Sequence, residues 1–154
     1  MQQIVRGCGL VAILACSSPL LAEDLTVSAL KAFTARVDDA TARCDVDTVV
    51  GHVAELAMIT LNQNDNGGMR ILRMNKSKYR EFLTIVCSGI SDYRYARTNE
   101  KISIDGDQAI ITADITETMV IQGREITAKT REKATVESID GKLMLTQLVA
   151  NEVL

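Results

Sequence analysis

Apolar residues recur at steps of three and four in three segments of the first half of the chain, which predicts three amphipathic helices. The first covers residues 26–44, and its apolar stripe is Leu30, Phe33, Val37, Ala40 and Cys44. The second is capped by Asp45, whose carboxylate suits the free N–H groups at a helix start, and is expected to continue to residue 57. The third is capped by Asn75, and its stripe is Tyr79, Phe82, Leu83, Val86, Cys87 and Ile90.

Two short strands are expected between the second and third helices, and four longer strands after residue 92. The sequences MITL (58–61) and MRILRM (69–74) predict the short strands, with a loop rich in Asn and Gly between them. Beyond residue 92 the apolar period changes from 3.6 to 2, and the remainder is divided into hairpins by the turn signals Asp105-Gly106, Gln122-Gly123 and Asp140-Gly141. Helices followed by an antiparallel meander are typical of the α+β class.

Polar residues interrupt the face of this sheet that is expected to pack on the core. The alternation that buries Ile111 and Ile115 places several polar or charged residues on the same face: Arg94, Glu100, Glu117, Thr130, Glu132, Gln147 and Asn151. Buried charges are costly unless they are paired, so these residues are expected either to pair or to lie where the structure is open.

A ligand pocket is one interpretation of these polar positions, and it would be lined by Arg94, Glu117, Glu132 and Gln147. Arg94 is expected opposite Glu117 or one step away, and Glu132 across from Val149. Two alternatives stay open. The side chains extend past the helices into water, or a β-bulge reverses the alternation.

Residues 1–22 have the three parts of a secretory signal: Arg6 in a short polar start, an apolar run over 7–16, and small residues ending at Ala22. The apolar run is too short to span a bilayer. Cleavage after Ala22 would leave one domain, residues 23–154, as a periplasmic or secreted protein. The alternative is cleavage before Cys16 with acylation of that cysteine, and only this route would attach the domain to a membrane.

Charge and composition argue against nucleic-acid binding. The net charge is −3, aromatic residues make up 3% of the chain, and there is no Trp. The chain therefore lacks both the excess of basic residues that attracts phosphates and the aromatic side chains on which bases stack. Lys129, Arg131 and Lys133 form a basic tract on the outer sheet face, where Asp114 or Glu137 can neutralise part of it. Such a tract is usually a solvated strand face. Its Thr-rich neighbours also suit a contact between two sheets, which would form a homodimer.

Cysteine usage indicates one disulfide. Cys8 leaves with the signal and Cys16 is either removed or acylated, so Cys44 and Cys87 remain. In an oxidising compartment such a pair is expected to be bonded, the alternative being two buried thiols. His52, the one histidine, is expected at the partly exposed edge of the second helix. One His beside paired cysteines does not supply a metal site, and we expect neither a metal nor a cofactor.

The order of elements resembles the nuclear-transport-factor-two-like superfamily, which includes ketosteroid isomerase-like and SnoaL-like proteins. The resemblance rests on CDVDTVVGHVAELAMITL (44–61), NKSKYREFL (75–83) and IDGKLMLTQLVANEVL (139–154). It implies three N-terminal helices packed in a curved, mainly antiparallel sheet, a cone with a pocket at its open end and a sheet face often used for dimerisation. It also implies that the helices carrying Cys44 and Cys87 pack together. Isomerase-like members carry a carboxylate just after the second helix, and a rough alignment puts that position in 59–62, where there is no acid.

We therefore expect an exported, non-catalytic domain that binds a small ligand in the cone or a protein partner through its sheet. One alternative is an enzyme of the isomerase, dehydratase or cyclase type, with Glu117 or Glu132 as general base. Another is an envelope assembly subunit. The enzyme requires a deep pocket with a perturbed glutamate, the binding domain a pocket without one, and the assembly subunit a filled cone with an exposed apolar face.

Overall fold

The computed structural model describes residues 24–65 and 68–153, so the expected signal segment, residues 1–22, lies outside the described part. The helices are α1 (Val27–Ala42), α2 (Val46–Gly51) and α3 (Lys76–Ser88). The strands are β1 (Val53–Asp65), β2 (Gly68–Met74), β3 (Ser91–Asp105), β4 (Gln108–Ile121), β5 (Arg124–Ile139) and β6 (Lys142–Glu152). Within the described residues, no helix is long and apolar enough to cross a membrane.

Side-chain caps begin all three helices. Thr26, Asp45 and Asn75 each accept a hydrogen bond from a backbone N–H three residues ahead, at 3.0 to 3.1 Å. These contacts satisfy N–H groups that have no partner inside the helix, which confirms the two caps expected at Asp45 and Asn75.

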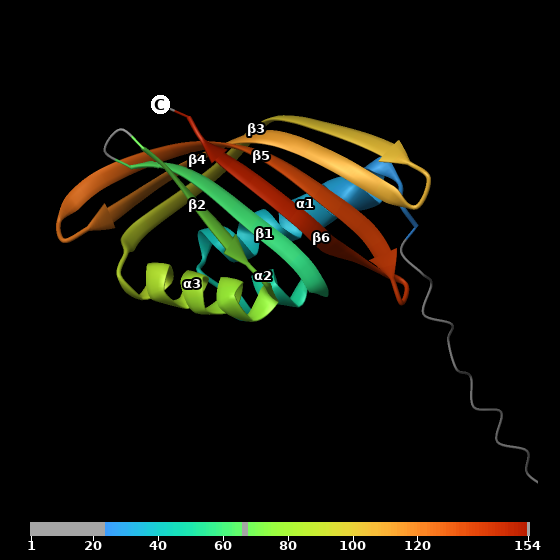
Figure 1. Ribbon diagram of the computed structural model, residues 1–154, viewed down its shortest axis with the longest axis horizontal. Helices are drawn as coiled ribbons and strands as arrows, with labels where there is room; N and C mark the ends of the chain where they lie inside the picture. The colour runs from blue at the N-terminus through green and yellow to red at the C-terminus, as the bar shows by residue number, and fades with distance from the viewer. Residues whose placement is uncertain (1–23, 66–67, 154) are drawn as a thin grey trace, which may run out of the picture.

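The six strands form one curved sheet in the order β2-β1-β6-β5-β4-β3. Every neighbouring pair is antiparallel except β1 and β6, which are parallel. The sheet arches over the helices, which lie against its concave side (Figure 1). The α+β class and the mainly antiparallel sheet are as expected. The β1–β2 hairpin between α2 and α3 contains the two short strands predicted there, and both strands extend beyond the predicted residues.

The second helix is much shorter than the apolar spacing predicts. It ends at Gly51, and Val53 already pairs with Leu145 of β6, while the backbone N–H of Leu145 donates to the carbonyl of His52 at 2.8 Å. Glycine at the last helical position weakens the helix, and parallel pairing with β6 supplies hydrogen bonds that a longer helix would forgo. The expected helix over 46–57 is therefore wrong in its second half. The segment just after the second helix begins at His52, so the absence of an acid in 59–62 does not bear on isomerase chemistry.

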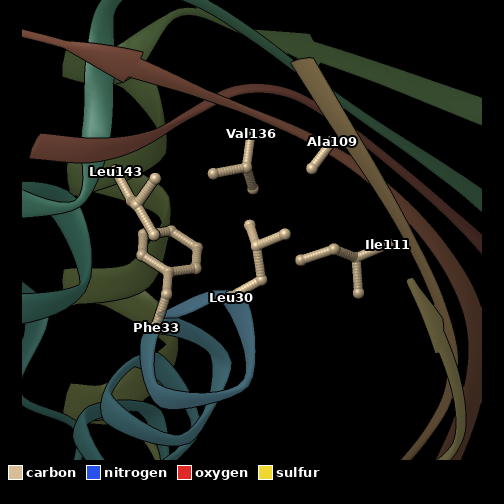
Figure 2. Close-up of a cluster of buried hydrophobic side chains, with 6 residues drawn as sticks. All are labelled: Leu30, Phe33, Ala109, Ile111, Val136 and Leu143. Carbon is tan, nitrogen blue, oxygen red and sulfur yellow. The ribbon is translucent and has the colours of Figure 1, made fainter. Parts of the chain in front are cut away.

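One part of the core lies where α1 faces the three central strands. Leu30 and Phe33 project from α1 toward Ala109, Ile111, Val136 and Leu143 of β4, β5 and β6, and all six side chains are buried (Figure 2). A second buried cluster joins β1, β2 and β6 to Tyr79 and Phe82 of α3. The apolar stripe predicted for the first helix and the alternation predicted for β4 are confirmed by these contacts.

Cys44 and Cys87 form a disulfide with a Cα–Cα distance of 5.7 Å. Cys44 lies in the turn after α1, with a positive φ of 53°, and Cys87 lies in the last turn of α3. The bond ties the turn between α1 and α2 to the far end of α3, so it holds together the helical side of the molecule.

Candidate ligand-binding cavity

A cavity of about 540 Å³ separates the helices from the concave face of the sheet. This volume lies within the range of small-molecule pockets. All three helices contribute to its wall, and typical apolar side chains in the lining are Phe33, Val49, Phe82, Ile111, Met119 and Leu148. Ile85 of α3 also lines it and is 71% exposed, so the cavity reaches the surface beside this helix.

Glu132 projects from β5 into this cavity, and its side chain is 16% exposed. Among the described residues none donates a hydrogen bond to its carboxylate, and the nearest cationic atom, Nη2 of Arg97, is 3.6 Å from Oε2. Burial raises the pKa of Glu132 to about 7; Arg97 opposes this shift, while the carboxylates of Glu117 and Asp38 add to it. Glu132 therefore changes charge near neutral pH inside a mainly apolar cavity.

Arg97 lies on β3 and is held by Asp38 of α1 in a two-point ion pair. Nε lies 2.8 Å from Oδ2 and Nη2 lies 2.9 Å from Oδ1. Glu100 lies at a longer distance, 3.9 Å from Nε. Burial alone would lower the pKa of Arg97, but the hydrogen bonds to Asp38 and the surrounding negative charge raise it instead. The guanidinium is thus a permanent cation, and its strongest hydrogen bonds go to Asp38.

All three tyrosines of the chain, Tyr79, Tyr93 and Tyr95, line the cavity. The Tyr93 hydroxyl donates to Oε1 of Glu117, and the Tyr95 hydroxyl accepts from Nη2 of Arg97 at 3.1 Å. The hydroxyl of Tyr79 has no hydrogen-bond partner among the residues that the structure describes. Burial raises the pKa of each tyrosine well above its ordinary value, so all three keep their protons at neutral pH.

A β-bulge in β3 decides which basic residue faces the cavity. Thr98 pairs with Asp114 and Lys101 with Thr112, so two residues of β3 stand opposite one of β4. Asn99 occupies the bulge with a φ of 53°. From the bulge toward the start of β3, the alternation of inward-facing and outward-facing side chains is reversed. Arg97 therefore points inward, whereas strict alternation would have turned the residues on either side of it inward.

Arg94 is consequently not a pocket residue. It pairs with Thr118 rather than Glu117, its side chain is 68% exposed, and its guanidinium lies 2.8 Å from Glu125. The expectation of Arg94 beside Glu117 on the concave side is wrong. The polar triplet Thr98-Asn99-Glu100 is the one sequence signal for this bulge, because Asn tolerates a positive φ better than most residues.

A second bulge moves Gln147 to the outer face. Val136 pairs with Leu145 but Thr135 with Gln147, which leaves Thr146 as the extra residue. Gln147 is exposed, whereas Leu148 and Ala150 are buried and line the cavity. Glu132 accordingly lies across from Ala150 instead of Val149. The bulge alternative was thus realised twice, and of the four expected pocket residues Glu117 and Glu132 line the cavity while Arg94 and Gln147 do not.

His52 lies at the end of α2 and also lines the cavity. Its Nδ1 is 2.8 Å from the carbonyl oxygen of Thr48, and its ring meets that of Phe33 edge to face at 5.5 Å. Over residues 24–65 and 68–153, no group of three or more His, Cys, Asp or Glu side chains is arranged to hold a metal ion.

No protein-family model and no curated protein matches this sequence. Several solved structures share the architecture. An NTF2-like protein from Cytophaga hutchinsonii aligns with a TM-score of 0.66 and 11% identity over 82% of this chain and 97% of that one. The chain has the nuclear-transport-factor-two-like (NTF2-like) fold.

Two further solved structures share this NTF2-like fold. A ketosteroid isomerase-like protein from Erwinia carotovora atroseptica gives a TM-score of 0.62 and 13% identity over 80% of this chain and 93% of that one. A protein of unknown function with a cystatin-like fold from Nostoc punctiforme gives 0.63 and 17% identity over 85% of this chain and 96% of that one. The superfamily resemblance noted in the sequence is confirmed at the level of the fold.

Proposed function

We propose that this NTF2-like domain binds a small, mainly apolar molecule in the cavity between its helices and its sheet. The observation that carries the proposal is the combination of about 540 Å³ of space, a mainly apolar wall and a carboxylate, Glu132, to which no described residue donates a hydrogen bond. Apolar walls with a few converging polar groups are the usual make-up of small-molecule sites. An envelope assembly subunit would need a filled cone, so the open cavity weighs against that alternative.

Binding can be tested with N-phenyl-1-naphthylamine, a neutral apolar dye whose fluorescence rises when it leaves water. We expect saturable binding with one site per chain. Ala128 and Ala150 line the cavity, and replacing both by Phe would fill part of it, so A128F/A150F should weaken dye binding at least tenfold. Thr127→Phe on the opposite side of β5 is the matched control. Equal binding by all three proteins would overturn the proposal.

A catalytic role is the second candidate, and the raised pKa of Glu132 favours it. An enzyme of the isomerase, dehydratase or cyclase type requires a perturbed glutamate in a deep pocket, and Glu132 supports this role as well as simple binding. A carboxylate with a pKa of about 7 can accept and return a proton at neutral pH, and the tyrosine hydroxyls can donate to a developing oxyanion. Proton exchange at the α-carbon of an apolar ketone, followed by NMR in D₂O, should be lost in Glu132→Gln if this role is correct.

We also propose that the domain acts outside the cytoplasm after cleavage at Ala22, which the Cys44–Cys87 disulfide supports because such bonds persist in oxidising compartments. The N-terminal sequence of the protein isolated from the cell envelope should begin at Glu23. An N-terminus at an acylated Cys16 would contradict this proposal and show that the protein is a membrane-anchored lipoprotein.

A homodimer through the outer face of the sheet is proposed as the resting state. Met58 of β1 and Ile71 of β2 are 47% and 50% exposed on this face. Sedimentation equilibrium should give twice the chain mass, and Met58→Glu with Ile71→Glu should return the monomer. A wild-type monomer at micromolar concentration would rule this out.

A further inference from the structure

The charged groups in the cavity wall are unbalanced. Three glutamates line it, Glu117, Glu132 and Glu152, against the single guanidinium of Arg97. One guanidinium cannot neutralise all three, and Arg97 shares its charge between Glu132, 3.6 Å away, and the two-point ion pair with Asp38. The cavity therefore has an excess of negative charge in a mainly apolar surrounding.

Two of these carboxylates have hydrogen-bonding capacity to spare. Glu117 accepts from the Tyr93 hydroxyl, and none of the other described residues donates to it. Glu132 accepts no hydrogen bond from a described residue and lies 3.6 Å from its nearest cationic atom. A carboxylate can accept about four hydrogen bonds, and a buried one costs several kcal/mol unless it is paired. Both groups can thus accept a further cationic or hydrogen-bond-donating partner beside Arg97 and Tyr93.

The aromatic rings around these carboxylates suit the same partner. Tyr79 of α3 and Tyr93 and Tyr95 of β3 all line the cavity, and the charges of Glu117 and Glu132 act on all three side chains. The Tyr79 hydroxyl makes no hydrogen bond to a described residue and is therefore available to a molecule in the cavity. Tyrosine faces attract cations, and aromatic rings combined with carboxylates are a recognised way to bind ammonium groups.

We propose that the cavity takes an apolar molecule that carries one cationic nitrogen, a protonated amine or a quaternary ammonium, with the cation between Glu117, Glu132 and the tyrosine rings. This deepens the proposed function and rests on it. An apolar carboxylate of the same size would bring a further negative charge toward three glutamates and is excluded by repulsion. A neutral analogue would fill the cavity but bring no positive charge to either carboxylate.

The charge state of Glu132 makes this preference depend on pH. The titratable and charged groups around it, in the cavity wall or in the Arg97 cluster, are Asp38 of α1, His52 after α2, Tyr79 of α3, Tyr93, Tyr95, Arg97 and Glu100 of β3, Glu117 of β4 and Glu152 of β6. A cation binds the ionised carboxylate, whereas a neutral ligand does not need it. With a pKa of about 7, affinity for the cation should fall about tenfold between pH 8 and pH 6, as the ionised fraction falls.

The test uses the disulfide-bonded protein and the dye N-phenyl-1-naphthylamine, displaced by three ten-carbon compounds: decyltrimethylammonium, decanol and decanoate. We expect the ammonium compound to displace the dye at a concentration at least tenfold below that of decanol, and decanoate to be weakest. The fixed charge of a quaternary nitrogen keeps the probe cationic at every pH. Glu132→Gln and Glu117→Gln should each reduce the preference for the cation, and Glu132→Gln should also abolish the pH dependence between 6 and 8.

Glu125→Gln is the matched control, since Glu125 is 62% exposed and pairs with Arg94 on the outer face. It should retain both the preference and the pH dependence. Displacement by decanoate at the same concentration as the ammonium, or a cation preference that survives in both cavity variants, would overturn the inference while leaving binding of apolar molecules intact. If neither the dye nor any of the three compounds binds, the proposed function fails as well.

Discussion

Arg97 of β3 and Asp38 of α1 are joined by two parallel hydrogen bonds, 2.8 and 2.9 Å long, across the interface between sheet and helix. Their side chains are 14% and 22% exposed. The pair fixes α1 against the edge of the sheet that the remaining helices do not cover. It also holds in place the one cation whose position lowers the energetic cost of burying Glu132.

Removing the two partners should have unequal effects. Arg97→Gln leaves the carboxylates of Asp38 and Glu132 without a cation, so we expect a loss of about 3 kcal/mol at pH 8 in the free energy of unfolding measured with urea. Asp38→Asn should cost less, because Glu132 and Glu100 stay near the guanidinium and can replace part of the lost attraction. Equal losses would contradict this account of the cluster.

Stability should depend on the protonation of Glu132. Its pKa is raised from an unfolded value near 4.5 to about 7, so the folded state binds the proton more tightly than the unfolded chain does. The contribution of this group to stability is therefore highest below pH 4.5 and falls by about 3 kcal/mol as pH rises to 7. Glu132→Gln should remove this fall and unfold at a higher temperature than the wild type at pH 8.

The comparison of wild type and variant isolates Glu132 from other titrating groups. Asp45 and Asp114 shift in the opposite direction, since hydrogen bonds from Thr48 and Asn99 lower their pKa values, but both are shared by the two proteins. Glu125→Gln again serves as the control and should follow the wild type. A difference between wild type and E132Q that stays constant from pH 5 to pH 8 would refute the assigned pKa.

The disulfide should supply a large share of the stability. It closes a loop of 43 residues, for which the chain-entropy model gives about 4 kcal/mol. Cys44→Ala with Cys87→Ala should lower the denaturation midpoint accordingly, and dithiothreitol should do the same to the wild type but not to the variant. Thiol titration of the unfolded, unreduced protein should find no free thiol at these two positions.

The stability of the bulge at Asn99 should depend on which residue occupies this position. A φ of 53° is open to glycine and costly for a β-branched side chain. Asn99→Val is expected to destabilise by about 2 kcal/mol, from strain and from the lost hydrogen bond to Asp114. Asn99→Gly should lose only the hydrogen bond and cost less than half as much. The reverse order in thermal denaturation would show that the left-handed conformation is not required.

Local signals in the sequence predicted most of the secondary structure, because capping residues, turn pairs and regular apolar spacing act within a few residues of one another. The turn at Asp140-Gly141 has two residues in the left-handed region, as its composition predicts. The errors in predicted secondary structure lie in segments whose conformation depends on pairing with a strand that is distant in the sequence. Val53 fits a helical stripe as well as it fits a strand, and only β6, about ninety residues away, selects the strand.

Bulges caused the errors at the candidate site. Each bulge adds one residue that has no counterpart on the neighbouring strand. Every side chain on one side of the bulge therefore changes from one face of the sheet to the other. Glu117 and Glu132 lie on β4 and β5 between the two bulges, where the alternation is unbroken, and both were predicted correctly. Arg94 and Gln147 lie beyond the bulges at Asn99 and Thr146, and both were placed on the wrong face.

The position of β6 has a consequence for the order in which the molecule can fold. It is the last of the described strands to be synthesised, yet it lies between β1 and β5 and is the only link between the β1–β2 hairpin and the other strands. Until residues 142–152 are available, the hairpin cannot join the remaining strands and the wall of the cavity is incomplete. We therefore expect the cavity to close only in a late step of folding, when the two parts of the sheet meet on either side of β6.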